Sequence, residues 1–216
     1  MIKAKHRNWA KYIFKLYIFK QFKKNFHSFK LIGDLPNFGE SPILLLTNHS
    51  SWWDGFFTFY LNEAIFKKKY HIMMLEDQLE KYYFFQYLGA YSIKQESPKS
   101  IIESINYTKS LLLNNSIVNI YPEGKMDYSF KNNVKYKGGI LKVLENNKNI
   151  NLVHTAIKII HLHNEKPEVF FSFENINYSD LKINNLENSM NTMLSSIDSN
   201  IDNASILFNG KKTRSE

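Results

Sequence analysis

The sequence predicts an α/β domain with a mostly parallel sheet flanked by helices, preceded by a basic amphipathic helix. Short apolar runs alternate with longer stretches of helical periodicity along most of the chain, and this alternation is typical of βαβ units. Two of the runs, 42–47 and 116–120, end directly in turns that hold charged residues. Such turns lie at the carboxyl edge of a parallel sheet, where α/β proteins bind their ligands.

The elements follow one another in a regular order. The apolar runs predict strands at 42–47, 70–75, 90–93, 116–120, 152–161 and 168–173. The intervening stretches predict helices at 54–68, 76–88 and 97–113, a glycine turn leading into a helix within 136–148, and a mostly helical segment at 178–199. Ser97 as N-cap before Pro98 marks the start of the third helix. We therefore expect a helix in 1–30, the main domain in 31–205, and a frayed tail in 206–216.

Residues 1–30 form a basic segment on an otherwise neutral chain. They hold eight lysines, one arginine and no acidic residue, whereas the remaining residues carry nineteen basic and twenty acidic side chains. An apolar stripe at helical spacing runs through the segment, with Trp9 and Ile13 beside it: Tyr12, Leu16, Phe19, Phe22 and Phe26. We expect this helix to lie on an anionic membrane surface, as a peripheral anchor on the cytoplasmic face. The alternative is that the stripe packs on the domain.

Other roles for the basic segment are excluded by its pattern. Its apolar runs are far shorter than the ~20 residues that span a bilayer, and it lacks the continuous apolar stretch and cleavage site of a signal peptide. No nucleic-acid-binding motif accompanies the charge, so we expect no nucleic-acid partner. The whole chain has no cysteine, which excludes disulfides and thiol catalysis.

His49 and Asp54 form the first candidate catalytic pair. They stand five positions apart in NHSSWWD at 48–54, directly after the strand at 42–47. If a helix begins near Ser51, Asp54 can fold back onto the imidazole, fix its tautomer and leave the other ring nitrogen as a base. No GxSxG elbow is present, so the base would act directly on a substrate hydroxyl. The alternative is a helix-capping aspartate beside an ordinary loop histidine.

The second motif, YPEG at 121–124, follows the strand at 116–120, and YKG follows at 136–138. Together these residues resemble the PlsC-like glycerolipid acyltransferase family, which includes the 1-acylglycerol-3-phosphate acyltransferases. NHSSWWD matches the family block NHxSxxD, YPEG matches FPEG, and LGAYSIKQ at 88–95 matches LGxxxxxR except at its end. VHTAI at 153–157 loosely matches a strand that reads VPVAI, so that the resemblance covers about residues 30–165.

The resemblance implies an O-acyltransferase without metal or resident cofactor. The acyl donor would be acyl-CoA or acyl-carrier protein, and the acceptor a hydroxyl of a lysophospholipid. His49 would be the general base and Asp54 its orienting carboxylate. Substrate-binding residues would include Glu123, which could meet acceptor hydroxyls, and Gly124, Lys125, Lys137 and Lys94. A backbone N–H near Gly124 or at the helix start would stabilise the oxyanion.

Two departures put the acceptor in doubt. Gln95 and Met126 stand where the family usually has arginines associated with the acceptor's phosphate, and neither can offer an arginine's bidentate fork. The lysines at 94, 125 and 137 could replace the charge but not the fork. A non-phosphate acceptor, such as a glycolipid or glycosylated isoprenoid, is therefore one alternative. A non-catalytic lipid-surface binding protein is the other.

The remaining candidates are weaker. Trp52 and Trp53 would shield the site or line an acyl-binding tunnel, with ordinary core packing as the alternative. His161 and His163 alternate on one strand face, but no further ligand stands at metal-binding spacing, so we expect no metal site. His71 and His154 are interpreted as structural.

Overall fold

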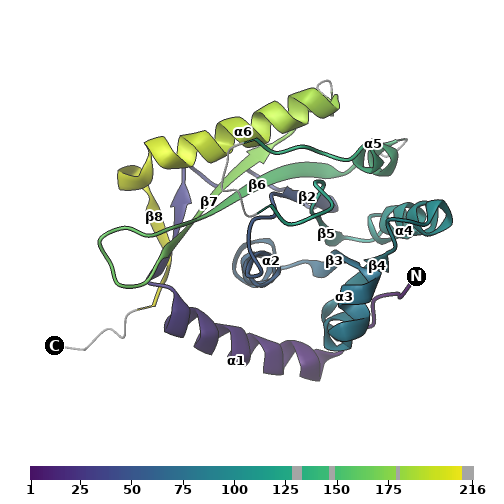
Figure 1. The fold of residues 1–216 in the computed structure, drawn as a ribbon, viewed down its shortest axis with the longest axis horizontal. Coiled ribbons are helices and arrows are strands. Elements are labelled where there is room, and N and C mark those ends of the chain that lie inside the picture. Colours follow the sequence, from purple (N-terminus) through teal and green to yellow (C-terminus); the bar gives the residue numbers. More distant parts are fainter. Residues whose placement is uncertain (128–132, 146–148, 179–180, 211–216) are drawn as a thin grey trace.

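Eight strands form one sheet in the order β4-β3-β5-β2-β6-β7-β1-β8, with helices on both faces (Figure 1). The computed structural model describes residues 1–127, 133–145, 149–178 and 181–210. The strands are β1 (Ser28–Ile32), β2 (Ile43–Thr47), β3 (Lys69–Leu75), β4 (Ala90–Ile93), β5 (Ser116–Ile120), β6 (Asn151–Ile160), β7 (Glu168–Asn175) and β8 (Ser205–Asn209). Five of the seven strand pairs are parallel and two, β6–β7 and β1–β8, are antiparallel. The predicted fold class is confirmed.

The helices divide between two layers (Figure 1). They are α1 (Asn8–Asn25), α2 (Asp54–Leu61), α3 (Glu76–Lys81), α4 (Pro98–Leu111), α5 (Gly139–Leu144) and α6 (Ile183–Ser199), with short turns η1 (Asn62–Phe66), η2 (Tyr83–Leu88) and η4 (Ile201–Asn203). One core contains α1, α2 and η2 together with Ile43 and Leu45 of β2. The other contains α5 and α6 together with Leu44 and Leu46. The alternation along β2 shows why its five residues are all buried: both faces of this central strand are covered.

Several predicted boundaries are wrong. Residues 28–32 form β1, which pairs with β7, instead of ending the predicted N-terminal helix. Residues 205–209 form β8 on the sheet edge, so the predicted tail is ordered up to that strand, and 211–216 lie outside the described residues. The predicted helix 54–68 ends earlier, in a π-turn closed by Lys67 with φ 51°. The predicted helix 76–88 breaks at Tyr82 into a 3-10 turn. The last helix starts at Ile183, and 179–180 are outside the described part.

Helix α1 packs on the domain through a different stripe from the predicted one. Its buried residues are Ala10, Phe14, Ile18 and Phe22, spaced four apart along 18 residues. The predicted stripe members Tyr12 and Leu16 are instead 66 % and 58 % exposed. Tyr12 and Leu16 therefore do not pack on the domain as the alternative prediction had it, whereas Phe22 of the same stripe does. The helix carries apolar residues on two faces, and periodicity alone does not tell which face the sheet covers.

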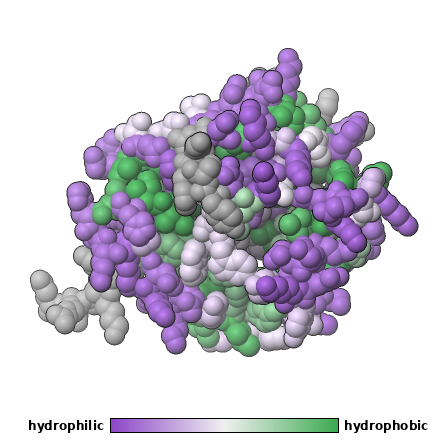
Figure 2. All heavy atoms as spheres, viewed as in Figure 1, coloured by the Kyte–Doolittle hydropathy of each residue, from purple (hydrophilic) through white to green (hydrophobic). Residues whose placement is uncertain are grey.

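The outward face of α1 is partly apolar and partly basic. Trp9, Tyr12, Ile13 and Leu16 are exposed on its N-terminal half, and lysines follow on its C-terminal half. Figure 2 shows hydrophobic side chains along the lower edge of the molecule, over α1 as placed in Figure 1, with hydrophilic ones beside them. None of the described helices is long and apolar enough to cross a bilayer.

Candidate active site

The turn between β2 and α2 brings His49 and Asp54 together as predicted. Oδ2 of Asp54 lies 2.9 Å from Nδ1 of His49 and accepts the backbone N–H groups of Ser50 and Ser51, each at 2.8 Å. The Asp54 side chain is fully buried, whereas 20 % of the His49 side chain is exposed. Because the carboxylate holds Nδ1, the other ring nitrogen, Nε2, is the one that can take a proton from a ligand.

Tyr121 fixes the imidazole from one side. Its ring stacks on that of His49, with 4.1 Å between the centroids and 16° between the planes. Burial raises the pKa of Asp54, and the hydrogen bonds from His49 and from the N–H groups of Ser51 and Ser50 counter this effect. Burial also raises the pKa of Tyr121 well above its ordinary value. The Tyr121 side chain is therefore neutral, and its stacked ring restricts the orientation of the His49 imidazole.

The YPEG turn lies beside the His49 turn because β2 and β5 are parallel neighbours, with Leu46 opposite Ile120. Oε2 of Glu123 accepts the backbone N–H of His49 at 2.8 Å, and the N–H of Asp127 donates to the His49 carbonyl at 2.8 Å. Burial raises the pKa of Glu123 to about 8; the His49 N–H opposes this shift, and the charges of Asp54 and Asp127 add to it. The prediction that these two loops lie side by side is confirmed.

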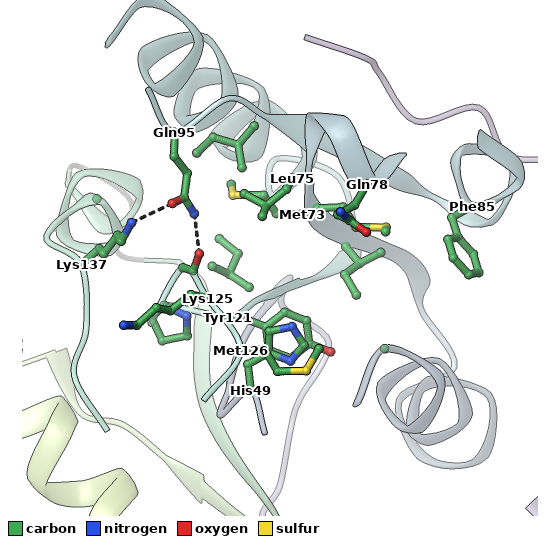
Figure 3. Close-up of a pocket in the computed structure, with 18 of the residues that line it drawn as sticks. His49, Met73, Leu75, Gln78, Phe85, Gln95, Tyr121, Lys125, Met126 and Lys137 are labelled. Atoms are coloured by element: carbon green, nitrogen blue, oxygen red, sulfur yellow. Dashed lines mark hydrogen bonds between the residues drawn. The ribbon is translucent and has the colours of Figure 1, made fainter. Parts of the chain in front are cut away.

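Gly124 and Gln95 link this turn to Lys137. Gly124 has φ +71°, and an added Cβ would lie 2.8 Å from Cε of Lys137. Nε2 of Gln95 donates to the Gly124 carbonyl at 2.6 Å, and Nζ of Lys137 donates to Oε1 of Gln95 at 2.7 Å (Figure 3). The glutamine in the place of the family's arginine therefore uses its amide to connect the turn to a lysine.

An apolar cavity of about 660 Å³ opens beside His49. In Figure 3, Gln95, Lys125 and Lys137 lie toward one end of it and Phe85 toward the other. Its wall combines side chains from both helical layers and from β3, including Phe14, Phe56, Phe59, Ile72, Phe85 and Ile105. Met126 also lines this cavity (Figure 3). A cavity of this size and lining can hold a long hydrocarbon chain.

A second, smaller pocket of about 200 Å³ adjoins His49. Most of the residues that line it are polar or charged, among them Asn48, Ser50, Glu123, Lys125, Lys135 and Lys158, and four aliphatic residues complete the wall: Val134, Ile157, Ile159 and Leu194. His49 and Lys125 line both spaces. The histidine therefore stands where an apolar space meets a polar one.

The structure separates the other predicted residues. Lys94 is exposed and is not part of the wall of either cavity. Trp52 lines the apolar cavity, whereas Trp53 packs in the core, 5.2 Å from the Phe26 ring. His154 is buried in β6 with Nδ1 2.9 Å from Oγ of Ser189, in agreement with a structural role.

Three of the backbone N–H groups near the expected oxyanion site already donate to protein acceptors. The N–H of Gly124 donates to the Tyr121 carbonyl at 3.1 Å. The N–H groups of Ser50 and Ser51, in the turn before α2, donate to Asp54.

Sequence reasoning missed three contributors to the site. Phe14 of α1 reaches the apolar cavity, although its segment was expected to act apart from the domain. Lys158 and Leu194 reach the polar pocket from β6 and α6. No local sequence signal marks these residues, because only the three-dimensional packing brings them to His49. The stacking of Tyr121 on His49 was also not predicted, although Tyr121 is the first residue of the recognised YPEG motif and its aromatic ring was an available signal.

Comparisons with known proteins agree with this geometry. A family model described as acyltransferase matches residues 19–158, well over half of the chain. The crystal structure of the 1-acyl-sn-glycerophosphate (LPA) acyltransferase PlsC from Thermotoga maritima is similar in fold, with a TM-score of 0.53 and 14 % identity over 86 % of this chain and 80 % of that chain. No curated protein matches the sequence. On the strength of the family match, the chain belongs to the acyltransferase family.

Proposed function

We propose that this protein transfers a fatty acyl group from an acyl thioester to a hydroxyl of a glycerolipid-type acceptor. Nε2 of His49 takes the proton of the acceptor hydroxyl as its oxygen attacks the thioester carbonyl. The C–O bond forms, the C–S bond breaks, and the imidazolium returns the proton to the departing thiolate. Asp54 holds the tautomer and stabilises the imidazolium. General-base catalysis of this kind contributes about 10²–10⁴-fold.

The observation that carries the proposal is the position of the His49–Asp54 pair between two unlike cavities. The apolar cavity suits an acyl chain, and the polar pocket suits the part of the acceptor next to its reacting hydroxyl. Lys125 and Lys137, near one end of the apolar cavity, could hold a phosphate of acyl-CoA or of the carrier protein's prosthetic arm. Either donor fits this arrangement.

The enzyme would work as a peripheral protein on an anionic membrane surface. Support comes from the exposed apolar residues on α1 and from the lysines that follow them. Such helices bind the membrane interface because their apolar side chains insert into it and their lysines are attracted to anionic lipids. Phe14 of the same helix lines the apolar cavity. A membrane-bound α1 would therefore place that cavity close to its lipid substrates.

The test is thiol release from acyl-CoA and from acyl-carrier protein, measured with and without lysophospholipid and monoacylglycerol acceptors, with the ester product identified. Acceptor-dependent release by the wild type, abolished in folded His49→Ala and kept in the exposed-residue control His161→Ala, is the expected result. Absence of turnover with every donor and acceptor would favour a non-catalytic lipid-binding role. Unchanged turnover in His49→Ala would remove the proposed base.

A further inference from the structure

We infer that the polar pocket beside His49 binds the acceptor's head group, and that this group is an uncharged, hydroxyl-rich one such as glycerol or a sugar, not a phosphomonoester. The inference rests on the proposed acyl transfer and specifies its second substrate. The pocket, of about 200 Å³, is bounded by residues 48–50, the segment after the YPEG turn, β6 and Leu194 of α6. Since His49 lines it, a hydroxyl placed there lies within reach of the base.

The charges around the pocket are balanced. Of its three lysines, Lys135 lies 3.0 Å from a carboxylate oxygen of Glu187, and Lys158 lies 2.6 Å from a carboxylate oxygen of Asp198. Lys125 shares the pocket wall with two carboxyl groups, those of Glu123 and Asp127. A phosphomonoester dianion would have to compete with Glu187 and Asp198 for two of these three ammonium groups, which reduces the electrostatic gain.

Bidentate phosphate recognition is also missing from the site region. The chain has two arginines, Arg7 and Arg214, and residues 8–213 contain none. Met126, at one family arginine position, lines the apolar cavity instead of the polar pocket. Gln95, at the other family arginine position, uses its amide to hydrogen-bond the Gly124 carbonyl and the Lys137 ammonium group. Neither position provides the fork that distinguishes phosphate from other groups.

The same wall suits hydroxyl groups. A carboxyl group accepts hydrogen bonds when ionised, and it can also donate one when protonated. Glu123 has a pKa of about 8 because of its burial, so both forms are accessible near neutral pH. Asn133 and Ser50 add amide and hydroxyl groups to the wall. Polyols, which both donate and accept, can satisfy such a mixed set without bringing in charge.

The first test compares two acceptors of equal chain length in the same neutral mixed micelles, monoacylglycerol and lysophosphatidic acid. We expect kcat/KM for monoacylglycerol to equal or exceed that for lysophosphatidic acid. A kcat/KM for lysophosphatidic acid that exceeds the value for monoacylglycerol would overturn the inference on chemical class. This result is read only from an enzyme that turns over, so it is separate from a failure of the proposed reaction.

The second test asks whether the acceptor head group binds in the polar pocket. Ile159 lines the pocket and packs against the core that contains α1 and α2. Its neighbour in β6, Ile160, does not line the pocket and packs against the core that contains α5 and α6, so it is the matched control. Ile159→Trp should raise the ratio of acceptor KM to donor KM at least tenfold, and Ile160→Trp should leave this ratio unchanged. An equal ratio in both variants would overturn the location.

A labelling experiment needs neither variant nor turnover. A monoacylglycerol with a photoreactive group on its glycerol is cross-linked to the wild-type protein, and the labelled peptides are identified by mass spectrometry. Label on residues 48–50, 123, 125, 127, 133–135, 157–159 or 194 supports the inference. Label confined to other segments overturns it, even if no thioester is consumed. Inactivity in the turnover assay would then count against the proposed reaction alone.

Discussion

The two spaces beside His49 differ in what builds them. The apolar cavity draws on core side chains of α1, α2, η2 and α4, some of them part of the main hydrophobic cluster. The polar pocket draws on loop residues, the end of β6 and one residue of α6. The apolar cavity is therefore largely part of the folding core, whereas the polar pocket combines loop residues with three core members, Val134, Ile157 and Leu194. Substitutions at the loop residues of the polar pocket should affect stability less than substitutions in the apolar cavity, where a change of volume requires repacking.

The largest effect should come from the His49–Asp54 pair, because His49 lines both the apolar cavity and the polar pocket. Asp54→Asn keeps the shape of the side chain and an oxygen for the N–H groups of Ser50 and Ser51, but it removes the charge that stabilises protonated His49. We expect kcat to fall by about 10²–10⁴-fold with either type of acceptor. Single-turnover acyl transfer, together with circular dichroism to verify folding, measures this. A loss seen with one acceptor only would mean that the two spaces do not share one base.

The next effect should be confined to the apolar side. Gly55 lines the cavity, and a Cβ placed there would lie 3.7 Å from Cδ1 of Ile72, an ordinary contact. Gly55→Ala should therefore retain activity, whereas Gly55→Leu should lower kcat/KM about 10- to 100-fold for long acyl donors and much less for short ones. The acceptor KM should not change. The measurement is a series of acyl-CoA chain lengths at saturating acceptor. An equal loss at all chain lengths would show that the acyl chain lies elsewhere.

This division also explains what the sequence could predict. The strands β2 and β5 were predictable because each is a short apolar run that ends in a turn, and their parallel pairing follows from the alternation with helices. Because parallel strands present their carboxyl ends at the same edge of a sheet, His49, Asp54 and Glu123 could be assigned to one edge from local pattern. Where a site is built from adjacent loops, the spacing of motifs along the sequence is enough to predict which residues form it.

The remaining parts depended on information that a local pattern does not contain. The face of α1 that packs inward was not predicted, because Phe14 and Ile18 compete with Tyr12 and Leu16 for the core and only the sheet decides. Strand β8 was missed because an edge strand with exposed residues has no distinctive periodicity. The polar pocket was not predicted, since Lys158 and Leu194 reach it from elements far along the chain.

A smaller effect, on stability, should be specific to the polar side. Glu123 has a folded-state pKa of about 8 against an ordinary value of 4.5. Between these values the folded state keeps a proton that the unfolded state has lost, so the free energy of unfolding falls as pH rises. The contribution is fully present below pH 4.5 and is lost as pH passes through 8. From pH 6.5 to 8 the expected loss is about 2 kcal/mol.

Urea unfolding of the wild type and Glu123→Gln at pH 6.5 and 8 measures this difference. The window lies above the pKa values of the buried His71 and His154, which burial lowers to about 3 and about 4, so neither changes its protonation in the folded state there. The amide variant should lose much less stability over the same interval, and Glu96→Gln, an exposed control, should behave as the wild type. Equal slopes in wild type and Glu123→Gln would show that the carboxyl is ionised in the fold.

The smallest expected effect concerns the proposed contact of α1 with an anionic membrane. Deleting α1 cannot test this, because Phe14, Ile18 and Phe22 belong to the core and their loss would unfold the domain. Single substitutions on the outward face leave that core intact. Lys20, Lys23 and Lys24 are exposed on the C-terminal half of the helix. Each lysine near an anionic leaflet contributes about 1 kcal/mol, which corresponds to about a fivefold change in binding.

Lys23→Gln should therefore weaken binding to vesicles containing an anionic phospholipid about fivefold at low salt, and the difference should shrink as salt rises, since screening acts over about 10 Å at 0.1 M. Lys142→Gln, an exposed lysine of α5 in the other helical layer, is the matched control and should bind as the wild type does. Co-sedimentation at two salt concentrations measures both variants. If Lys23→Gln and Lys142→Gln weaken binding equally, the attraction comes from net charge and not from α1. If neither substitution nor salt changes binding, α1 is a packing element only, and substrates reach the apolar cavity without help from the outward face of α1.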